Sequence, residues 1–263
     1  MKKNKLKIPF KRICFYATIL LTLTFIVIYT WRFLRTSDQF KITEVLTRDD
    51  TTIDFSYLKG RNLLSLDLRQ ESRNILQYFP ECKRIRMVRI LPNRIFINLI
   101  KRKPVALIKL YRVFALDEDQ VLFEVPALVD SQEYGLPVIL GMETKIFGPK
   151  IGQKYNIKEL EFALSIIKEA KRNKVLRDYK IRKIDVPNTT NACVFVIPGT
   201  SDYEYIDSTL RYEGLEVKLS SDRVGYKVAV LANLMVAAKK EWNNIKYIDL
   251  RFKEPVIKLK DTR

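Results

Sequence analysis

Side chains that could do acid–base chemistry gather at one point of the chain, where three carboxylates stand in a row. Asp117, Glu118 and Asp119 lie in the stretch VFALDEDQVLF. A pair of carboxyl groups can hydrolyse a glycosidic bond, with one acting as acid and the other as base or nucleophile. The residues on both sides, however, alternate as two short strands do. We therefore interpret the three acids as the solvated tip of a hairpin.

The remaining residue types argue against catalysis. The chain has no histidine, which excludes Ser-His-Asp and Cys-His catalysis and histidine metal ligands. It contains no C-x-x-C pair and no G-x-x-x-x-G-K-[ST], G-x-G-x-x-G or G-x-S-x-G motif. Its eight glycines are few for a protein that binds phosphates with backbone amides. We expect no enzyme activity, no cofactor and no metal site.

The three cysteines do not form a disulfide framework. Cys14 falls within an apolar stretch, far in sequence from Cys82 and Cys193. The last two could pair in an oxidising compartment, or they could remain two separate thiols in apolar surroundings. A single loosely spaced pair favours the second interpretation.

One segment near the N-terminus is apolar and long enough to cross a membrane. Residues 13–31 carry no charge, and as a helix they span about 28 Å, close to the hydrocarbon thickness of a bilayer. A cleaved signal peptide has a shorter apolar region followed by small residues, which the sequence WRFLRTSDQF lacks. We predict an uncleaved transmembrane helix over residues 13–34, with its lipid-facing anchor including Ile13, Leu20, Phe25 and Trp31.

The flanking charges predict how this helix is oriented. Residues 1–12 carry six basic and no acidic residues, whereas Asp38 and Glu44 dilute the basic residues that follow the helix. The positive-inside bias makes residues 1–12 a cytoplasmic tail and places the remainder outside the cytoplasm. The net charge of +18 is spread along the chain. It indicates a solvated surface near anionic lipid or wall polymer rather than a nucleic-acid site.

The chain beyond the helix is long enough for two domains, and an apolar content of 47% supports a folded core. The first domain reads as strand, helix, helix, strand, strand, which predicts a three-stranded sheet backed by two helices. Asp67 is the expected N-cap of the second helix, with Gln70 completing a capping box, and Pro80 ends it. The segments are residues 40–46, 51–58, 67–79, 84–88 and 95–100.

The second region predicts a mixed α/β domain with an extended antiparallel sheet. Its helices cover residues 156–173, with Asn156 and Glu159 as a capping box, and a later segment from Asp222 as cap through Lys239. Strands are expected near residues 181–186, 193–197 and 215–219. The final segment, residues 252–259, alternates and carries Pro255, which is tolerated on an edge strand.

The residue motifs and the order of these elements resemble the FtsQ/DivIB family of bacterial cell division proteins. The sharpest match is Y-I-D-L-R-F at residues 247–252. Lys101 stands where the family has a glutamate, and Gln120 lies near the glycine position of a D-x-x-G hairpin. Further matches to the family's motifs are Gly60, Asn62, Leu63, Leu66, Asp67, Pro80, Arg89, Pro92, Arg102, Pro104, Val105, Ala106, Leu136, Pro137 and Gly141.

This resemblance implies an α+β fold and a function. After the transmembrane helix it implies a POTRA domain (βααββ) over residues 38–106, then a C-terminal β domain over residues 107–263. The family's members are non-enzymatic bitopic scaffolds of the divisome, in the inner membrane at the septum. Partners would be FtsB-like and FtsL-like proteins. The implied contacts are Arg251, Phe252, Glu254, Val256 and Lys258.

Within that site, Phe252 of this chain would be the main apolar contact for a partner, and the partner would add a strand to the last sheet edge. Ile248 and Leu250 are instead expected in the core. The POTRA-like region would be either a spacer or a second binding surface. Two other functions remain open: a membrane-anchored POTRA protein of secretion or envelope assembly, and an enzyme that acts on the cell wall.

Overall fold

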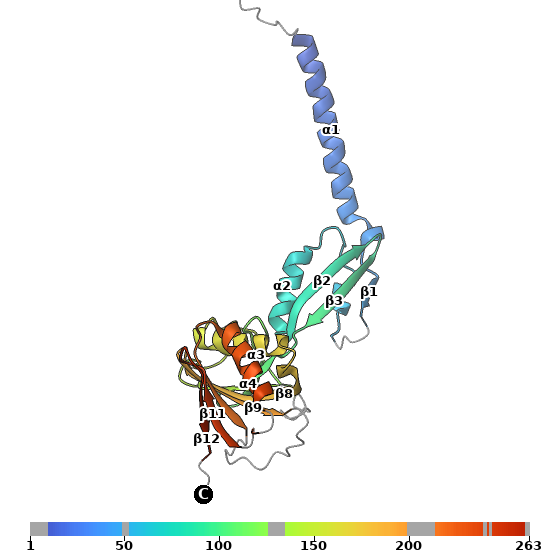
Figure 1. The fold of residues 1–263 in the computed structure, drawn as a ribbon. Helices are drawn as coiled ribbons and strands as arrows, with labels where there is room; N and C mark the ends of the chain where they lie inside the picture. The colour runs from blue at the N-terminus through green and yellow to red at the C-terminus, as the bar shows by residue number, and fades with distance from the viewer. Residues whose placement is uncertain are drawn as a thin grey trace, which may run out of the picture. The chain divides into compact units, whose positions relative to one another are not determined.

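A computed structural model describes residues 10–48, 53–125, 135–198, 214–238, 241 and 244–260. The chain divides into two compact units, residues 1–101 and residues 102–263 (Figure 1). Because each unit has its own sheet and its own hydrophobic core, each can be described by itself.

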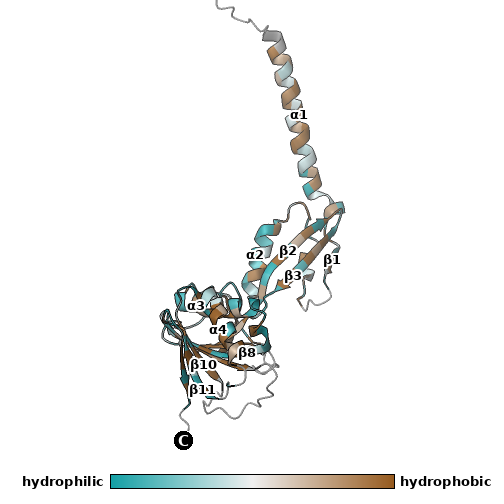
Figure 2. Cartoon of the chain, in the orientation of Figure 1, coloured by the Kyte–Doolittle hydropathy of each residue, from teal (hydrophilic) through white to brown (hydrophobic). Residues whose placement is uncertain are grey.

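The N-terminal helix α1 (Phe10–Thr36) is the predicted apolar helix. Its stretch Ile13–Thr36 is long and apolar enough to cross a membrane by length and composition, and none of its most apolar window is buried. Figure 2 shows apolar residues repeated along the middle of this helix. The predicted anchor residues lie on this exposed surface: Ile13, Leu20, Phe25 and Trp31. The N-terminal residues 1–9 of the expected cytoplasmic tail lie outside the described residues.

The first unit places three strands beside one another. They are β1 (Glu44–Thr47), β2 (Cys82–Ile90) and β3 (Arg94–Lys101), and β3 is central. β3 pairs in parallel with β1 and antiparallel with β2. α2 (Leu68–Tyr78) packs on this sheet, and the single 3-10 turns η1 (Asp38–Phe40) and η2 (Ser56–Leu58) complete the unit. The core contains Ile42, Phe55, Leu58, Leu63, Ile75, Ile95 and Ile97.

Local signals in this unit are confirmed in part. The Asp67 carboxylate accepts hydrogen bonds from the backbone N–H groups of Arg69 and Gln70, so it caps α2 as predicted. The side chain of Gln70 donates to Asn74 rather than returning to the N-cap. Only the Asp67 half of the predicted capping box has therefore formed. Of the helix expected over residues 51–58, the described part is the single turn η2; residues 51 and 52 lie outside the described residues.

The second unit contains a nine-stranded sheet. Its order is β12-β11-β10-β9-β8-β7-β4-β5-β6. The strands are β4 (Ala106–Lys109), β5 (Val113–Leu116), β6 (Leu122–Phe123), β7 (Val138–Leu140), β8 (Tyr179–Asn188), β9 (Asn191–Pro198), β10 (Leu215–Leu219), β11 (Ile245–Asp249) and β12 (Val256–Leu259).

This sheet is extended, as predicted, but it is mixed rather than antiparallel. β4 pairs in parallel with β7, β7 with β8, and β10 with β11. The two helices explain two of these pairs, because parallel neighbours need a crossover between them. α3 (Lys158–Arg172) connects β7 to β8, and α4 (Val224–Ala237) connects β10 to β11. The 3-10 turn η3 (Leu176–Asp178) leads from α3 into β8.

α3 and α4 pack beside each other against the strands (Figure 1). The side of α3 that faces the sheet buries Leu160, Ala163, Ile167 and Ala170, while Leu164 is only partly buried. Both helices meet the inward residues of β8, β9 and β10 in one large cluster. The helices and the sheet therefore form two layers around a shared core.

Two predicted helix caps are wrong. The N-cap of α3 is Ile157 rather than Asn156, without a side-chain cap, and Glu159 instead pairs with Lys145. The N-cap of α4 is Arg223 in a left-handed conformation. Asp222 accepts a hydrogen bond from Lys227 Nζ at 2.6 Å and another from Ser220. Each of these carboxylates forms an ion pair with a lysine, Glu159 with Lys145 and Asp222 with Lys227, and neither caps its helix. The predicted helix end, Lys239, lies outside the described residues.

The acidic hairpin also differs from its interpretation as a solvated tip. Asp117 is buried, with 1% of its surface exposed. Its carboxylate lies 2.5 Å from Arg102 Nη1 and accepts the backbone N–H groups of Asp119 and Val121. A buried carboxylate needs such donors to offset its lost hydration. Asp117 therefore holds the β5–β6 turn together, and only Glu118 is fully exposed there.

Candidate partner-binding edge

The last two strands set the candidate site at one end of the nine-stranded sheet. β11 lies between β10 and β12, and Leu250 donates its N–H to Lys218 O at 2.8 Å. Ile248 and Leu250 are 0% and 2% exposed, which confirms the prediction that both belong to the core. The Y-I-D-L-R-F block thus joins the β10–β11 core to the outermost strand.

β12 is the outermost strand of this sheet. It pairs antiparallel with β11 through Asp249↔Val256, Ile248↔Ile257 and Tyr247↔Lys258. In the part of the chain that the structure describes, no strand pairs with its other side. All four of its residues are exposed. An edge strand of this kind presents backbone N–H and C=O groups to which another chain can add a strand.

The two faces of β12 have different characters. Ile257 stands opposite the buried Ile248, on the side of the sheet that faces the core, yet it is 41% exposed. Leu259 is paired with Ile245 and is 56% exposed. Val256 and Lys258 lie on the opposite face, because side chains alternate along a strand. The apolar face of the core thus continues onto β12 without full cover.

Arg251 fixes the bend that leads from β11 to β12. Its Nη2 lies 2.6 Å from Asp249 Oδ2, and its Nε lies 3.0 Å from Asp249 Oδ1. The backbone N–H of Arg251 donates to the same carboxylate, and Nη1 reaches Asn191 Oδ1 at 3.2 Å. This residue was predicted as a partner contact. Its side chain makes these contacts within its own unit and is still 31% exposed.

The carboxylate of Asp249 depends on that arginine. Burial by itself would raise the pKa of Asp249. Hydrogen bonds from the side chain and backbone of Arg251, together with the charges of Arg251 and Lys218, outweigh burial and hold this pKa below its ordinary value. The hydrogen bonds to Asp249 also raise the pKa of Arg251. Both groups therefore remain ionised and keep the bend in one geometry.

The remaining predicted contacts line the bend and the strand. Phe252 is 61% exposed, and the guanidinium carbon of Arg251 lies 5.7 Å from its ring centroid. Glu254 is exposed in the bend, while Val256 and Lys258 are exposed on β12. An aromatic ring that is ordered but uncovered is suited to fill a pocket on a partner.

Two residues that the sequence prediction left out belong to the same edge. Ile257 and Leu259 are large, apolar and exposed on β12. The alternation of the final segment was visible in the sequence, but its interpretation selected the other face. Pairing that segment against the Y-I-D-L-R-F block would have set Ile257 beside the core residue Ile248 and revealed them. We call residues 251–259 the β12 edge.

A serine–lysine pair elsewhere in this unit resembles a catalytic arrangement. Lys227 Nζ lies 2.5 Å from Ser220 Oγ, and both residues are buried. The same ammonium group donates to Asp222 Oδ1, and Ser220 also donates to that oxygen. An activated serine needs a neighbouring base that takes its proton, whereas here both groups donate to Asp222. The cluster clamps the start of α4 to the end of β10.

The fold and the β12 edge define a class of protein: an α+β chain with an N-terminal apolar helix and an open sheet edge near its C-terminus. The chain is similar to Cell division protein FtsQ of Koribacter versatilis (strain Ellin345), with 32% identity over 118 residues. This alignment covers 43% of the present chain and 33%, about a third, of that relative's length. No family model matches the chain. The similarity confirms the resemblance to FtsQ that the sequence motifs indicated.

Proposed function

We propose that this chain is a non-enzymatic, single-pass scaffold of the bacterial division machinery. Similarity to an FtsQ protein supports the division role, and α1 has the length and apolar surface of a membrane anchor. Its N-terminus lies in the cytoplasm and the residues after α1 lie outside it, in keeping with the basic tail. The chain works in the inner membrane at the division septum.

The observation that carries this proposal is the exposed outermost strand β12. A partner that adds a strand there gains main-chain hydrogen bonds, and its side chains can cover Ile257 and Leu259. Phe252 supplies the aromatic anchor beside the strand. Lys258 and Glu254 are exposed charges that set which partner fits. The partners are FtsB-like and FtsL-like division proteins.

The first unit has a separate part in this proposal. Its strand, turn, helix, strand, strand order over residues 44–101 is compatible with a POTRA domain. We assign residues 38–106 to this POTRA-like domain and residues 107–263 to the C-terminal β domain typical of FtsQ and DivIB. The POTRA-like domain acts as a spacer between α1 and the β12 edge, or as a second contact surface for the divisome.

Partner binding by the full chain in lipid nanodiscs tests the proposal. Phe252→Ala should weaken capture of an FtsB-like protein by about tenfold, because truncating an interface anchor typically costs 1 kcal/mol or more. Tyr111→Ala is the matched control, since Tyr111 is 72% exposed in the β4–β5 turn, well away from β12 in the strand order. Equal affinities of the wild type and Phe252→Ala would contradict the assignment of Phe252.

Cell-level tests separate the division role from the alternatives. A fluorescent fusion to the N-terminus should gather at the division site. Uniform labelling of the envelope would instead favour a general envelope-assembly protein. Incubation of the full chain with peptidoglycan should release no soluble product, and release of wall fragments would favour an enzyme.

A further inference from the structure

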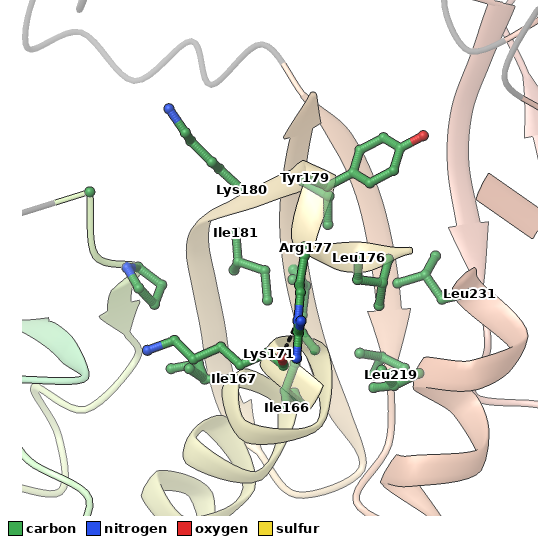
Figure 3. A pocket seen from close by; sticks show the side chains of 16 residues that line it. Ile166, Ile167, Lys171, Leu176, Arg177, Tyr179, Lys180, Ile181, Leu219 and Leu231 are labelled. Carbon is green, nitrogen blue, oxygen red and sulfur yellow. Dashed lines mark hydrogen bonds between the residues drawn. The ribbon is translucent and has the colours of Figure 1, made fainter. Parts of the chain in front are cut away.

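The second unit encloses an apolar cavity that the proposed scaffold function does not use. The cavity has a volume of about 240 Å³ and lies between the two helices and the sheet. Its walls come from α3, α4, η3, the strands β8, β9 and β10, and the residues Gly135 and Pro137 before β7. Figure 3 shows Ile166, Ile167, Ile181, Leu219 and Leu231 around it.

The wall of the cavity consists of small and branched apolar side chains. Ala170 comes from α3, Val194 and Val196 from β9, and Val228 from α4, and each is at most 8% exposed. Interiors are normally packed with few voids larger than a water molecule. An apolar cavity of this kind disfavours water and accepts an apolar guest. A water molecule takes about 30 Å³ in the liquid, so the cavity has room for a short apolar chain rather than for a single water.

The mouth of the cavity has charges of one sign. Lys171, Arg177 and Lys180 line it, and all three are exposed. Arg177 Nε donates to Lys171 O at 3.3 Å, which holds the guanidinium beside the opening (Figure 3). Among the described residues that line the cavity, none is acidic. Three cations at the entrance of an apolar space favour a guest with an anionic end.

We propose that this cavity binds a single-chain carboxylate, a medium-chain fatty acid, with its head at the mouth. The carboxylate lies in the positive field that Lys171, Arg177 and Lys180 create at the mouth, and the acyl chain extends between Ala170 and Val194. Each buried methylene favours binding, and the charge-assisted hydrogen bonds at the mouth select the acid over a neutral analogue. This site is separate from the β12 edge and does not depend on the division role.

A photoactivatable probe tests the site in the full chain. Decanoic acid that carries a diazirine near its methyl end is added to the protein in zwitterionic nanodiscs, irradiated, and mapped by peptide mass spectrometry. Adducts are expected within residues 166–181 or on Val194 and Val196. Unlabelled decanoate should compete at about tenfold lower concentration than decanol, as expected for hydrogen bonds to a charged group.

Variants separate the two features of the site. Ala170→Phe fills the cavity and should abolish labelling. The exposed double variant Lys171→Glu and Lys180→Glu should leave the fold intact, as judged by circular dichroism, and weaken competition by decanoate about tenfold. Lys174→Glu is the matched control, because Lys174 is exposed on the same loop but does not line the cavity.

Three results would overturn the proposal. They are adducts confined to α1 or spread over the surface, equal competition by decanol and decanoate, or an unchanged decanoate affinity in the double variant. Displacement of the probe by an acidic apolar peptide, but not by decanoate, would assign the cavity to a protein partner instead.

Discussion

Arg251 and Asp249, two residues apart, are joined by a forked ion pair at the point where β11 ends. The shortest contact joins Arg251 Nη2 and Asp249 Oδ2 at 2.6 Å, and Asp249 is 4% exposed. Arg251 also reaches Asn191, which begins β9. The direction in which the chain leaves the core, and hence the position of β12, therefore depends on this pair.

Replacement of this arginine should loosen the edge. Arg251→Ala removes the guanidinium and leaves the Asp249 carboxylate with the backbone N–H of residue 251, and it should destabilise the second unit by about 1–3 kcal/mol, the typical cost of an under-satisfied buried group. Hydrogen-exchange mass spectrometry should show faster exchange in β11 and β12. Lys253→Ala, at an exposed neighbour, should leave exchange unchanged. Equal protection in both variants would mean that the ion pair contributes little.

A pH dependence follows from the clamp at the start of α4. Hydrogen bonds from Lys227 and then Ser220 lower the pKa of Asp222 to about 2, from an ordinary value of 3.8. A carboxylate with a depressed pKa in the folded state stabilises the fold above its unfolded pKa and loses that contribution as pH falls through the folded value. Stability supplied by Asp222 should therefore be complete above about pH 5 and disappear between about pH 4 and pH 2.

Urea unfolding at several pH values measures this contribution. The stability difference between the wild type and Asp222→Asn should be constant from about pH 5 to pH 7 and should shrink toward zero near pH 2. Asp178→Asn, at an exposed aspartate on the turn before β8, controls for general acid effects. A difference between the wild type and Asp222→Asn that stays constant down to pH 2 would rule out titration of this carboxylate as its source.

Gln120 occupies a backbone conformation that suits glycine. Its φ is 65°, and its buried Oε1 has no hydrogen-bond partner within the described residues. Gln120→Gly should stabilise the second unit by about 1–2 kcal/mol, because it removes both the left-handed strain and the unsatisfied oxygen. Glu118→Gly, in the same turn, should destabilise instead. A lower melting temperature for Gln120→Gly would show that packing of the glutamine outweighs its strain.

Gly141 is needed for two reasons, and a second glycine separates them. Its φ is +84°, and an added Cβ would lie 3.0 Å from the carbonyl carbon and oxygen of Val186. Gly148 also has a positive φ of +58° but open space around it. Gly148→Ala should cost about 1 kcal/mol from backbone strain, and Gly141→Ala should cost more because β8 must also shift. Thermal unfolding of both variants in nanodiscs compares them; equal losses would assign the whole effect to φ.

Much of the local structure was predictable because its causes lie within a few residues. The apolar run before Trp31 predicted α1, and the strand alternation predicted β2, β3 and β8 to β10. Asp67 caps α2 because the backbone donors that it needs are the next residues in the chain. Asp222 does not cap α4 because its carboxylate pairs with Lys227, and the capping box of Asn156 and Glu159 did not form because Glu159 pairs with Lys145. A cap prediction from residue spacing does not include ion pairs with lysines that compete for the same carboxylate.

The sequence by itself determined the N-terminal apolar helix, two folded regions and a final segment with alternating apolar residues. The tertiary structure decided what these segments do. It buried Asp117 by setting Arg102 beside it, and it made part of the sheet parallel through two helical crossovers. It also left Ile257 and Leu259 exposed on an outermost strand. Strand order and cover depend on which distant segments meet, and that information is not present in any local pattern.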